Sequence, residues 1–148
     1  MKQDLRLLRL FLVLLAIVGA GRWAQGLRGV PYDIGNPVFS IVTLTILSAV
    51  FYGAFTRRWA RRNVLQAIRL GALIGLAAQA VIYASTAASY AFGIDSYFNH
   101  PRALNVEAAI PFAEAMARRA AGLVVGVANT AVAAALGWVL GALLPPRE

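Results

Sequence analysis

The chain has 148 residues, of which 60% are hydrophobic and 14% charged, and its mean hydropathy is +0.68. A soluble domain typically carries about 45–50% apolar and about 25% charged residues. Three stretches without a charged residue, 34–56, 70–94 and 120–146, are each long enough to cross a hydrocarbon core of about 30 Å. The composition therefore excludes a soluble enzyme, a DNA-binding domain and a disordered tail.

The residue types that are missing exclude several kinds of site. The chain has no cysteine, which excludes disulfides, thiolate metal sites and cysteine nucleophiles. Its one histidine, His100, excludes a haem held by two histidines of this chain. We therefore predict no metal and no cofactor. The formal net charge of +8 comes mostly from residues that flank apolar runs, a pattern typical of contacts with lipid headgroups and not of nucleic-acid binding.

The first membrane span is predicted over about residues 5–25. It is the weakest span because its charge-free core, 10–21, is short, so the flanking arginines must reach the interfaces along their aliphatic stems. An amphipathic helix lying in the membrane plane is the alternative. The run also has a loosely compatible signal-peptide cleavage site, but we interpret it as an uncleaved span.

The second and third spans are predicted over about residues 37–55 and 66–92. Proline is tolerated in the first turn of a helix, so Pro37 is expected to start the second span with Asn36 as its cap. The third span is expected to stop at Gly93, because glycine commonly follows a helix end.

The longest connection, residues 94–110, leads to the fourth span at about residues 119–144. Pro111 can open this last helix. Glu114 and Arg118 are four residues apart there, which places opposite charges on one helical face. The predicted fold is thus all-α: a polytopic integral membrane protein, 1–148 as a single membrane domain, forming a four-transmembrane-helix bundle.

The basic residues predict the orientation. With a cytoplasmic N-terminus, nine basic residues lie inside and five outside, which favours cytoplasmic N- and C-termini in a cell inner (plasma) membrane. The inner group is Lys2, Arg6, Arg9, Arg57, Arg58, Arg61, Arg62, Arg69 and Arg147, and the outer group is Arg22, Arg28, Arg102, Arg118 and Arg119.

Small residues recur every three or four positions along the fourth span and, over a shorter stretch, along the third. Such stripes let two helix backbones approach closely in lipid. They predict either packing of these two spans within one chain or a homo-oligomer interface along the fourth span. The candidate packing residues are Gly71, Gly75, Gly122, Gly126, Gly137 and Gly141.

A line of polar residues follows one face of the third span, with further polar residues on the second and fourth spans. Polar groups in hydrocarbon need hydrogen-bond partners, so this set predicts either interhelical bonds or an uncharged lining for a neutral solute or lipid headgroup. The set is Gln79, Tyr83, Thr86, Tyr90, Asn129, Thr130, Ser40 and Thr43.

Two charged segments complete the candidates. The 94–110 loop holds Asp95, His100, Arg102 and Glu107. With Asp33 and Glu114 on the same side of the membrane, an acid–base pair or a weak divalent-metal site could be drawn from them, although no catalytic or metal-binding motif is present. The run Arg57, Arg58, Arg61 and Arg62 predicts binding of anionic lipid headgroups, with an acidic partner as the alternative.

Three functions are compatible with these patterns. The first is passive permeation or transport of a small solute or lipid by a homo-oligomer, since ionisable groups that would drive proton coupling are missing from the middle of every span. The second is a non-catalytic membrane subunit or assembly partner. The third is an outward-facing enzyme acting on a lipid-linked substrate, which we rank last, so no catalytic residue is assigned.

Overall fold

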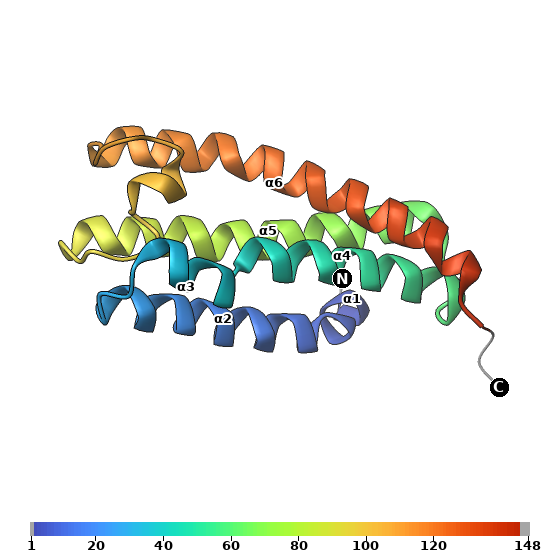
Figure 1. Ribbon diagram of the computed structural model, residues 1–148. Helices are drawn as coiled ribbons and strands as arrows, with labels where there is room; N and C mark the ends of the chain where they lie inside the picture. Colours follow the sequence, from blue (N-terminus) through green and yellow to red (C-terminus); the bar gives the residue numbers. More distant parts are fainter. Residues whose placement is uncertain (1, 146–148) are drawn as a thin grey trace.

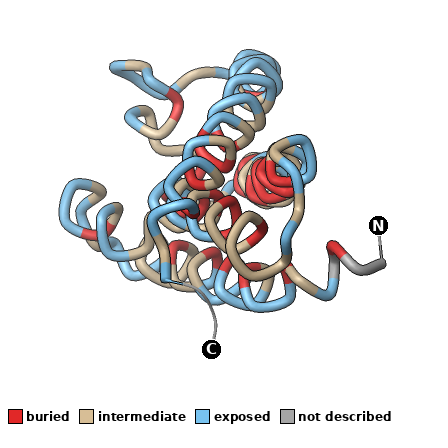
Figure 2. Tube along the Cα trace, turned by 90° about the vertical axis from the view of Figure 1, so that its right-hand side faces the viewer, coloured by how far each residue is buried: buried red, intermediate tan, exposed pale blue. Residues whose placement is uncertain are grey.

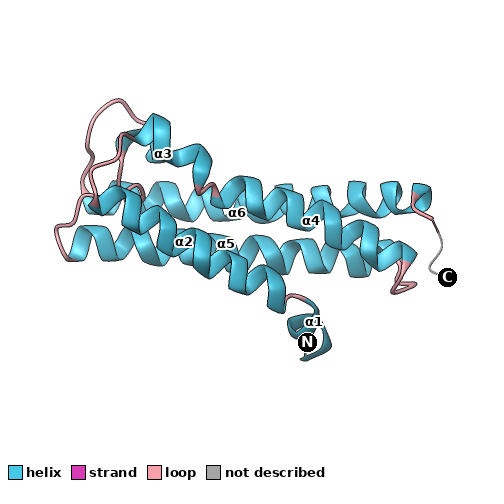
Figure 3. Ribbon diagram, turned by 60° about the horizontal axis from the view of Figure 1, so that its bottom comes forward, coloured by secondary structure: helices cyan, strands magenta, loops and turns pink. Residues whose placement is uncertain are grey.

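The protein is a bundle of helices. The computed structural model describes residues 2–145, except the side chains of residues 2, 3 and 5, and within that range it is 79% helix with no strand (Figure 3). Four helical segments are long and apolar enough to cross a membrane. These segments are Arg9–Leu27, Tyr32–Arg58, Val64–Ala91 and Phe112–Leu143. The predicted all-α, four-span membrane fold is therefore confirmed.

The chain forms six α-helices and two 3-10 turns over the described residues. In order they are α1 (Lys2–Leu7), α2 (Arg9–Leu27), α3 (Tyr32–Val38), α4 (Ile41–Arg58), α5 (Val64–Ala91), η1 (Pro101–Leu104), α6 (Phe112–Leu140) and η2 (Gly141–Leu143). The predicted spans overlap α2, α3 with α4, α5 and α6. Two residues counted for orientation, Arg147 and the Lys2 side chain, lie outside the described part of the chain, as do Pro146 and Glu148.

The long helices run side by side, with α4 and α5 in the middle (Figure 1). Helix α6 packs on both of them from one side, and α2 packs on both from the opposite side. We call the end that carries segments 28–40 and 92–111 the loop end, which is on the left of Figure 1. The opposite end, with the 57–63 connection and η2, is the terminal end.

The prediction that Pro37 starts the second span with Asn36 as its cap is wrong. Pro37 lies inside the short helix α3, and α4 begins only at Ile41. Ser40 is the cap, since its hydroxyl accepts a hydrogen bond from the Thr43 backbone N–H at 3.2 Å. Asn36 is not available for this role because its side-chain oxygen accepts a hydrogen bond from Arg22 at 2.6 Å.

Other helix ends agree with the sequence. Gly93 follows α5 with a φ of 61°, a left-handed conformation that glycine adopts without strain. Helix α6 begins directly after Pro111, and Glu114 and Arg118 form the expected ion pair across one turn at 3.0 Å. The start of α5 also has a reciprocal cap between Asn63 and Gln66.

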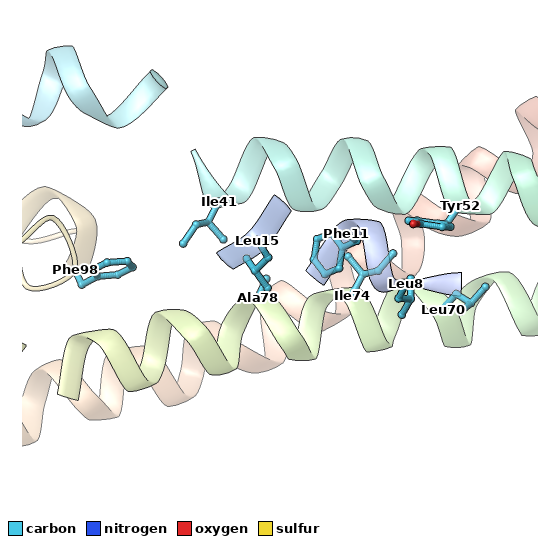
Figure 4. Packing of buried hydrophobic residues seen from close by; sticks show 9 residues of the cluster. All are labelled: Leu8, Phe11, Leu15, Ile41, Tyr52, Leu70, Ile74, Ala78 and Phe98. Atoms are coloured by element: carbon cyan, nitrogen blue, oxygen red, sulfur yellow. The ribbon is translucent and has the colours of Figure 1, made fainter. Parts of the chain in front are cut away.

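The apolar core lies between α2, α4 and α5, with one contribution from the loop end. Figure 4 shows its side chains, which are Leu8, Phe11, Leu15, Ile41, Tyr52, Leu70, Ile74, Ala78 and Phe98. Buried residues face the inside of the bundle, and the outer faces are exposed (Figure 2). Large apolar side chains such as Val124 and Leu136 remain exposed there, as expected for surfaces that contact lipid.

Helix α6 contacts its neighbours through glycine. A Cβ atom built on Gly71 of α5 would overlap the Thr130 carbonyl of α6, and one on Gly137 of α6 would overlap the Val50 carbonyl of α4. The backbones of these helices are therefore in direct contact. Close approach of this kind replaces the hydrophobic effect as the source of helix association in lipid.

Candidate functional site

A cavity of about 680 Å³ lies at the loop end of the bundle. Its walls come from α2, the α3–α4 junction, α5 and the first turns of α6, and the η1 segment contributes to the same wall. This volume lies within the range of small-molecule sites, roughly 300–1,000 Å³. The cavity is lined by four arginines, Arg22, Arg102, Arg118 and Arg119.

Arg22 extends from the last turns of α2 and is buried, with 8% of its surface exposed. Its guanidinium donates to the Asn36 side-chain oxygen at 2.6 Å and to the Tyr32 hydroxyl at 3.4 Å. The same group lies 5.4–5.7 Å from the ring centres of Tyr32, Tyr97 and Phe98. Aromatic faces stabilise the cation without neutralising it.

Arg119 lies on α6 and is half-buried. Its Nε donates to the Thr86 hydroxyl at 3.0 Å, and its Nη2 donates to the Phe98 carbonyl at 2.7 Å. Phe98 therefore joins the two cations, since its ring lies beside Arg22 and its carbonyl accepts from Arg119. All of these partners are neutral.

The other two arginines of the cavity are paired with carboxylates. Arg102 bonds to Asp33, and Arg118 bonds to Glu114 at 3.0 Å. All four of these side chains are more than two-fifths exposed. Exposed pairs contribute little to stability, about 0–1 kcal/mol each, but they cancel two of the four positive charges.

The electrostatic potential in the cavity is therefore positive. No carboxylate lines it within residues 2–145, and Arg22 and Arg119 have only neutral partners there. A guanidinium carries five N–H donors, and the contacts above use two from each. Two cations at a partly buried site are costly unless an anion neutralises them, and a bidentate oxyanion is the group that guanidinium geometry fits best.

Neutral polar groups and apolar side chains complete the walls. The neutral polar lining residues are Tyr32, Asn36, Ser40, Gln79 and Asn105. The apolar ones include Ile41, Val42, Ile82, Leu104 and Val125. A ligand in the cavity would thus meet charge-assisted donors from the arginines and further donors or acceptors around them.

The polar line predicted on α5 does not face a single space. Gln79 lines the cavity, whereas Thr86 is buried beneath Arg119 and also donates to the Ile82 carbonyl. Tyr90 donates to the Ile110 carbonyl at 2.8 Å, and Tyr83 is exposed on the outer surface. The structure therefore brings only part of this line to the cavity.

The polar candidates on α4 and α6 divide in a similar way. Ser40 lines the cavity and caps α4, and the exposed Thr43 donates its hydroxyl to Ser40. Asn129 and Thr130 line a second, smaller pocket of about 70 Å³ between α4, α5 and α6. The Thr130 hydroxyl also bonds to the Gly126 carbonyl one turn earlier.

The loop candidates are dispersed. Asp95 and Glu107 are exposed, and no cluster of three metal-ligating side chains occurs in the described part of the chain. His100 stacks on Tyr32 with ring centres 4.4 Å apart, and its Nδ1 accepts from the Arg102 backbone N–H. Burial, with a contribution from the Arg102 charge, lowers the pKa of His100 below its usual value.

Two side chains of the arginine run at the terminal end, Arg57 and Arg62, make contacts within the protein. Arg62 forms an ion pair with Asp4 at 2.9 Å, and its carbonyl accepts from the Trp138 indole. Arg57 stacks on Trp138 at 4.1 Å. Arg61 is exposed, with a φ of 50°, and the Nε of Arg58 is buried without a hydrogen-bond partner in the described structure.

The sequence did not single out the two arginines that carry the charge of the cavity, although its candidates Ser40, Gln79 and Arg102 also line it. Arg22 and Arg119 were assigned to the membrane interface by their positions, and Asn36 was assigned to a helix cap. One signal was available, because Arg22 and Arg119 are placed on the same side of the membrane. Their convergence on Phe98, however, depends on how three helices pack.

The comparisons with known proteins add no assignment. No protein-family model matches the chain, and no curated protein or solved structure matches it. The function is therefore argued from the geometry of the cavity.

Proposed function

We propose that this membrane protein binds an anionic ligand of the phosphate class in the loop-end cavity. The observation that carries the proposal is the pair Arg22 and Arg119. Both guanidiniums line the cavity, and both have only neutral partners within the described residues. Charge-assisted bonds from arginine to an oxyanion are about twice as strong as neutral ones.

The neutral lining favours a ligand with further polar groups. Asn36, Ser40, Gln79 and Asn105 can accept from or donate to hydroxyl groups next to the charge. Ion pairs with Asp33 and Glu114 hold the side chains of Arg102 and Arg118 in place beside the cavity. A simple ester or alcohol would leave both cations without a counter-charge, so an anion is the better fit.

The location of the site follows from the predicted orientation. If both termini are cytoplasmic, the cavity faces the outer side of a plasma membrane. An external phosphate-type ligand would then reach the cavity without crossing the membrane. The bundle is a multi-pass membrane domain. We propose that it associates in the membrane with a second copy of itself or with another membrane protein.

Passive transport is a second candidate, and the geometry supports it less well. The smaller pocket lined by Asn129 and Thr130 extends the cavity toward the middle of the bundle. Beyond it, α4 and α6 are in backbone contact at Gly53 and Gly137. Passage across the membrane would require these helices to separate, whereas binding at the loop end requires no such change.

Anion binding can be measured as stabilisation by ligand. The purified protein is melted in detergent at constant ionic strength while inorganic phosphate replaces chloride. A ligand that binds only the folded state stabilises it in proportion to ln(1 + [L]/Kd). Phosphate should raise the melting temperature of the unmodified protein. The Arg119→Gln variant should bind phosphate at least about tenfold more weakly, because it loses a charge-assisted bond of about 1.5–3 kcal/mol.

The matched control is Arg28→Gln. Arg28 is exposed at the loop end and does not line the cavity, so this variant should bind phosphate as the unmodified protein does. Equal losses in both variants would mean that surface charge alone attracts phosphate. If neither inorganic phosphate nor a phosphate ester stabilises the unmodified protein, the proposed function is rejected. Arg119→Lys, which keeps the charge but not the planar fork, should have an intermediate affinity.

A further inference from the structure

We infer that the anionic ligand is a lipid whose phosphate group lies between Arg22 and Arg119 and whose hydrocarbon chain leaves the cavity between α4 and α6. This inference rests on the anion binding proposed above and names the class of ligand. It follows from the shape of the cavity wall, the depth of Arg119 in the membrane and the positive charge that Arg22 and Arg119 leave unbalanced.

The cavity is bounded on one side by surfaces that face lipid. Val42 of α4 and Val125 of α6 both line the cavity, and 65% and 59% of their surfaces are exposed. Ala121 and Gly122 line the same edge and are exposed as well. Since α4 and α6 are membrane-spanning helices, exposure there means contact with hydrocarbon. The cavity therefore opens sideways into the bilayer.

A smaller pocket continues from this opening. This pocket of about 70 Å³ shares Ile41, Val42, Gln79 and Ile82 with the cavity. Its further lining includes Thr45, Ile46, Gly75, Ala78, Gly126 and Asn129. From Gly122 to Asn129, α6 rises about 10 Å. A hydrocarbon chain leading away from the cavity could lie along this stretch.

The depth of Arg119 fits a lipid phosphate. The segment Phe112–Leu143 has 32 residues, so it is about 48 Å long, against a hydrocarbon core of about 30 Å. Arg119 lies about 10 Å from the start of this segment. A helix centred on the bilayer would place Arg119 near the boundary between headgroups and hydrocarbon, where lipid phosphates lie.

The charge of the cavity selects among lipids. After Arg102 and Arg118 are paired with Asp33 and Glu114, the two remaining cations match a phosphate that carries one or two negative charges. A zwitterionic headgroup would also bring its own cation, and no carboxylate lines the cavity within the described residues to receive it. The cavity therefore favours phosphatidic acid over phosphatidylcholine.

The experiment compares binding of an anionic lipid with binding of inorganic phosphate, which has the charged group but no hydrocarbon chain. Binding of phosphatidic acid, phosphatidylcholine and inorganic phosphate to the detergent-solubilised full chain is measured by native mass spectrometry and by thermal stabilisation. Phosphatidic acid is expected to bind at least tenfold more tightly than either of the others. If inorganic phosphate binds as tightly as phosphatidic acid, the ligand is a soluble anion and the lipid inference is overturned. If neither binds, the proposed function fails with it.

A blocking variant tests the sideways opening. Val42→Trp fills the exposed edge shared by the cavity and the pocket, and it should weaken binding of phosphatidic acid about tenfold more than it weakens binding of phosphate. Leu47→Trp is the matched control, because Leu47 is exposed on α4 to the same extent but lines neither space. Equal lipid binding by both variants would overturn the proposed chain path.

A measurement on the unmodified protein covers the case in which Val42→Trp does not fold. Phosphatidic acids with four-carbon and eight-carbon chains are compared in the same detergent. The longer chains should bind more tightly, and this gain should be larger than the gain that the Arg119→Gln variant shows. No dependence on chain length in the unmodified protein would overturn the inference.

Discussion

The contact between α4 and α6 differs between its two halves. In the terminal half, Gly53 and Gly137 place the helix backbones in direct contact, since an added Cβ on either would overlap a carbonyl oxygen of the other helix. In the loop half, a Cβ on Gly122 would have no neighbouring atom within 4 Å. The same residue type on the same helix thus serves contact at one end and lines a cavity at the other.

This difference shows how a small bundle can hold a cavity. Backbone contact in the terminal half fixes the relative position of two stiff helices. Their other halves can then diverge without the pair coming apart, and the space between them holds the guanidiniums of Arg22 and Arg119. Glycine lowers helix stability by about 1 kcal/mol relative to alanine, so its presence is explained by contact only where another backbone is close.

The largest expected effect comes from adding a side-chain atom in the terminal half, where the backbones of α4 and α6 are in contact. Gly137→Ala adds a Cβ where the Val50 carbonyl stands, and neither backbone can give way cheaply. We expect a loss of about 3 kcal/mol in the free energy of unfolding. Thermal or denaturant unfolding in detergent measures this loss.

Gly122→Ala provides the control within the same helix. Because its Cβ meets no neighbour, the variant should be as stable as the unmodified protein or up to about 1 kcal/mol more stable through the higher helix propensity of alanine. A similar destabilisation in both variants would contradict the difference between the two halves.

A second, intermediate effect tests how the terminal end differs in charge from the cavity. There a carboxylate pairs directly with arginines, because Asp4 contacts Arg62 at 2.9 Å and Arg69 at 3.0 Å while being only 12% exposed. Asp4→Asn should therefore lower the free energy of unfolding by about 1–3 kcal/mol. Asp95→Asn, which changes an exposed aspartate, should leave it unchanged.

The ion pair between Asp4 and Arg62 also predicts that the free energy of unfolding decreases at low pH. The hydrogen bond from Arg62 lowers the pKa of Asp4, so the folded protein binds this proton more weakly than the unfolded chain does. The stabilisation by Asp4 is complete above the unfolded pKa of about 3.9 and is lost as the pH falls through the lower folded pKa. Unfolding between pH 6 and pH 3 should show this loss in the unmodified protein and not in Asp4→Asn.

The smallest expected effect concerns the loop end. Burial of the ring and the Arg102 charge lower the pKa of His100, although Asp33 opposes them. The neutral ring accepts from the Arg102 backbone N–H, so stability should fall as the pH drops from about 6.5 through the folded pKa. The melting temperature should decrease by about 1–2 °C. His100→Asn, which keeps an acceptor that does not titrate, should remove the decrease, and an unchanged pH profile would contradict this account.

Much of the fold could be predicted from local patterns. Charge-free stretches marked the spans, Gly93 marked the end of α5, and the spacing of Glu114 and Arg118 gave an ion pair that the structure contains. The start of α4 was predicted wrongly, because Asn36 was assigned to a cap on local grounds. Its side chain instead bonds to Arg22 from another helix, and sequence spacing carries no information about that contact.

The sequence by itself determined that this chain is an all-helical membrane protein with four spans, because hydropathy and helix length are properties of contiguous segments. Only the tertiary structure decided which polar residues share a space. Arg22, Phe98 and Arg119 belong to three segments far apart in the chain, and they meet only through the packing of these segments. A site made by packing has no signature in any single segment.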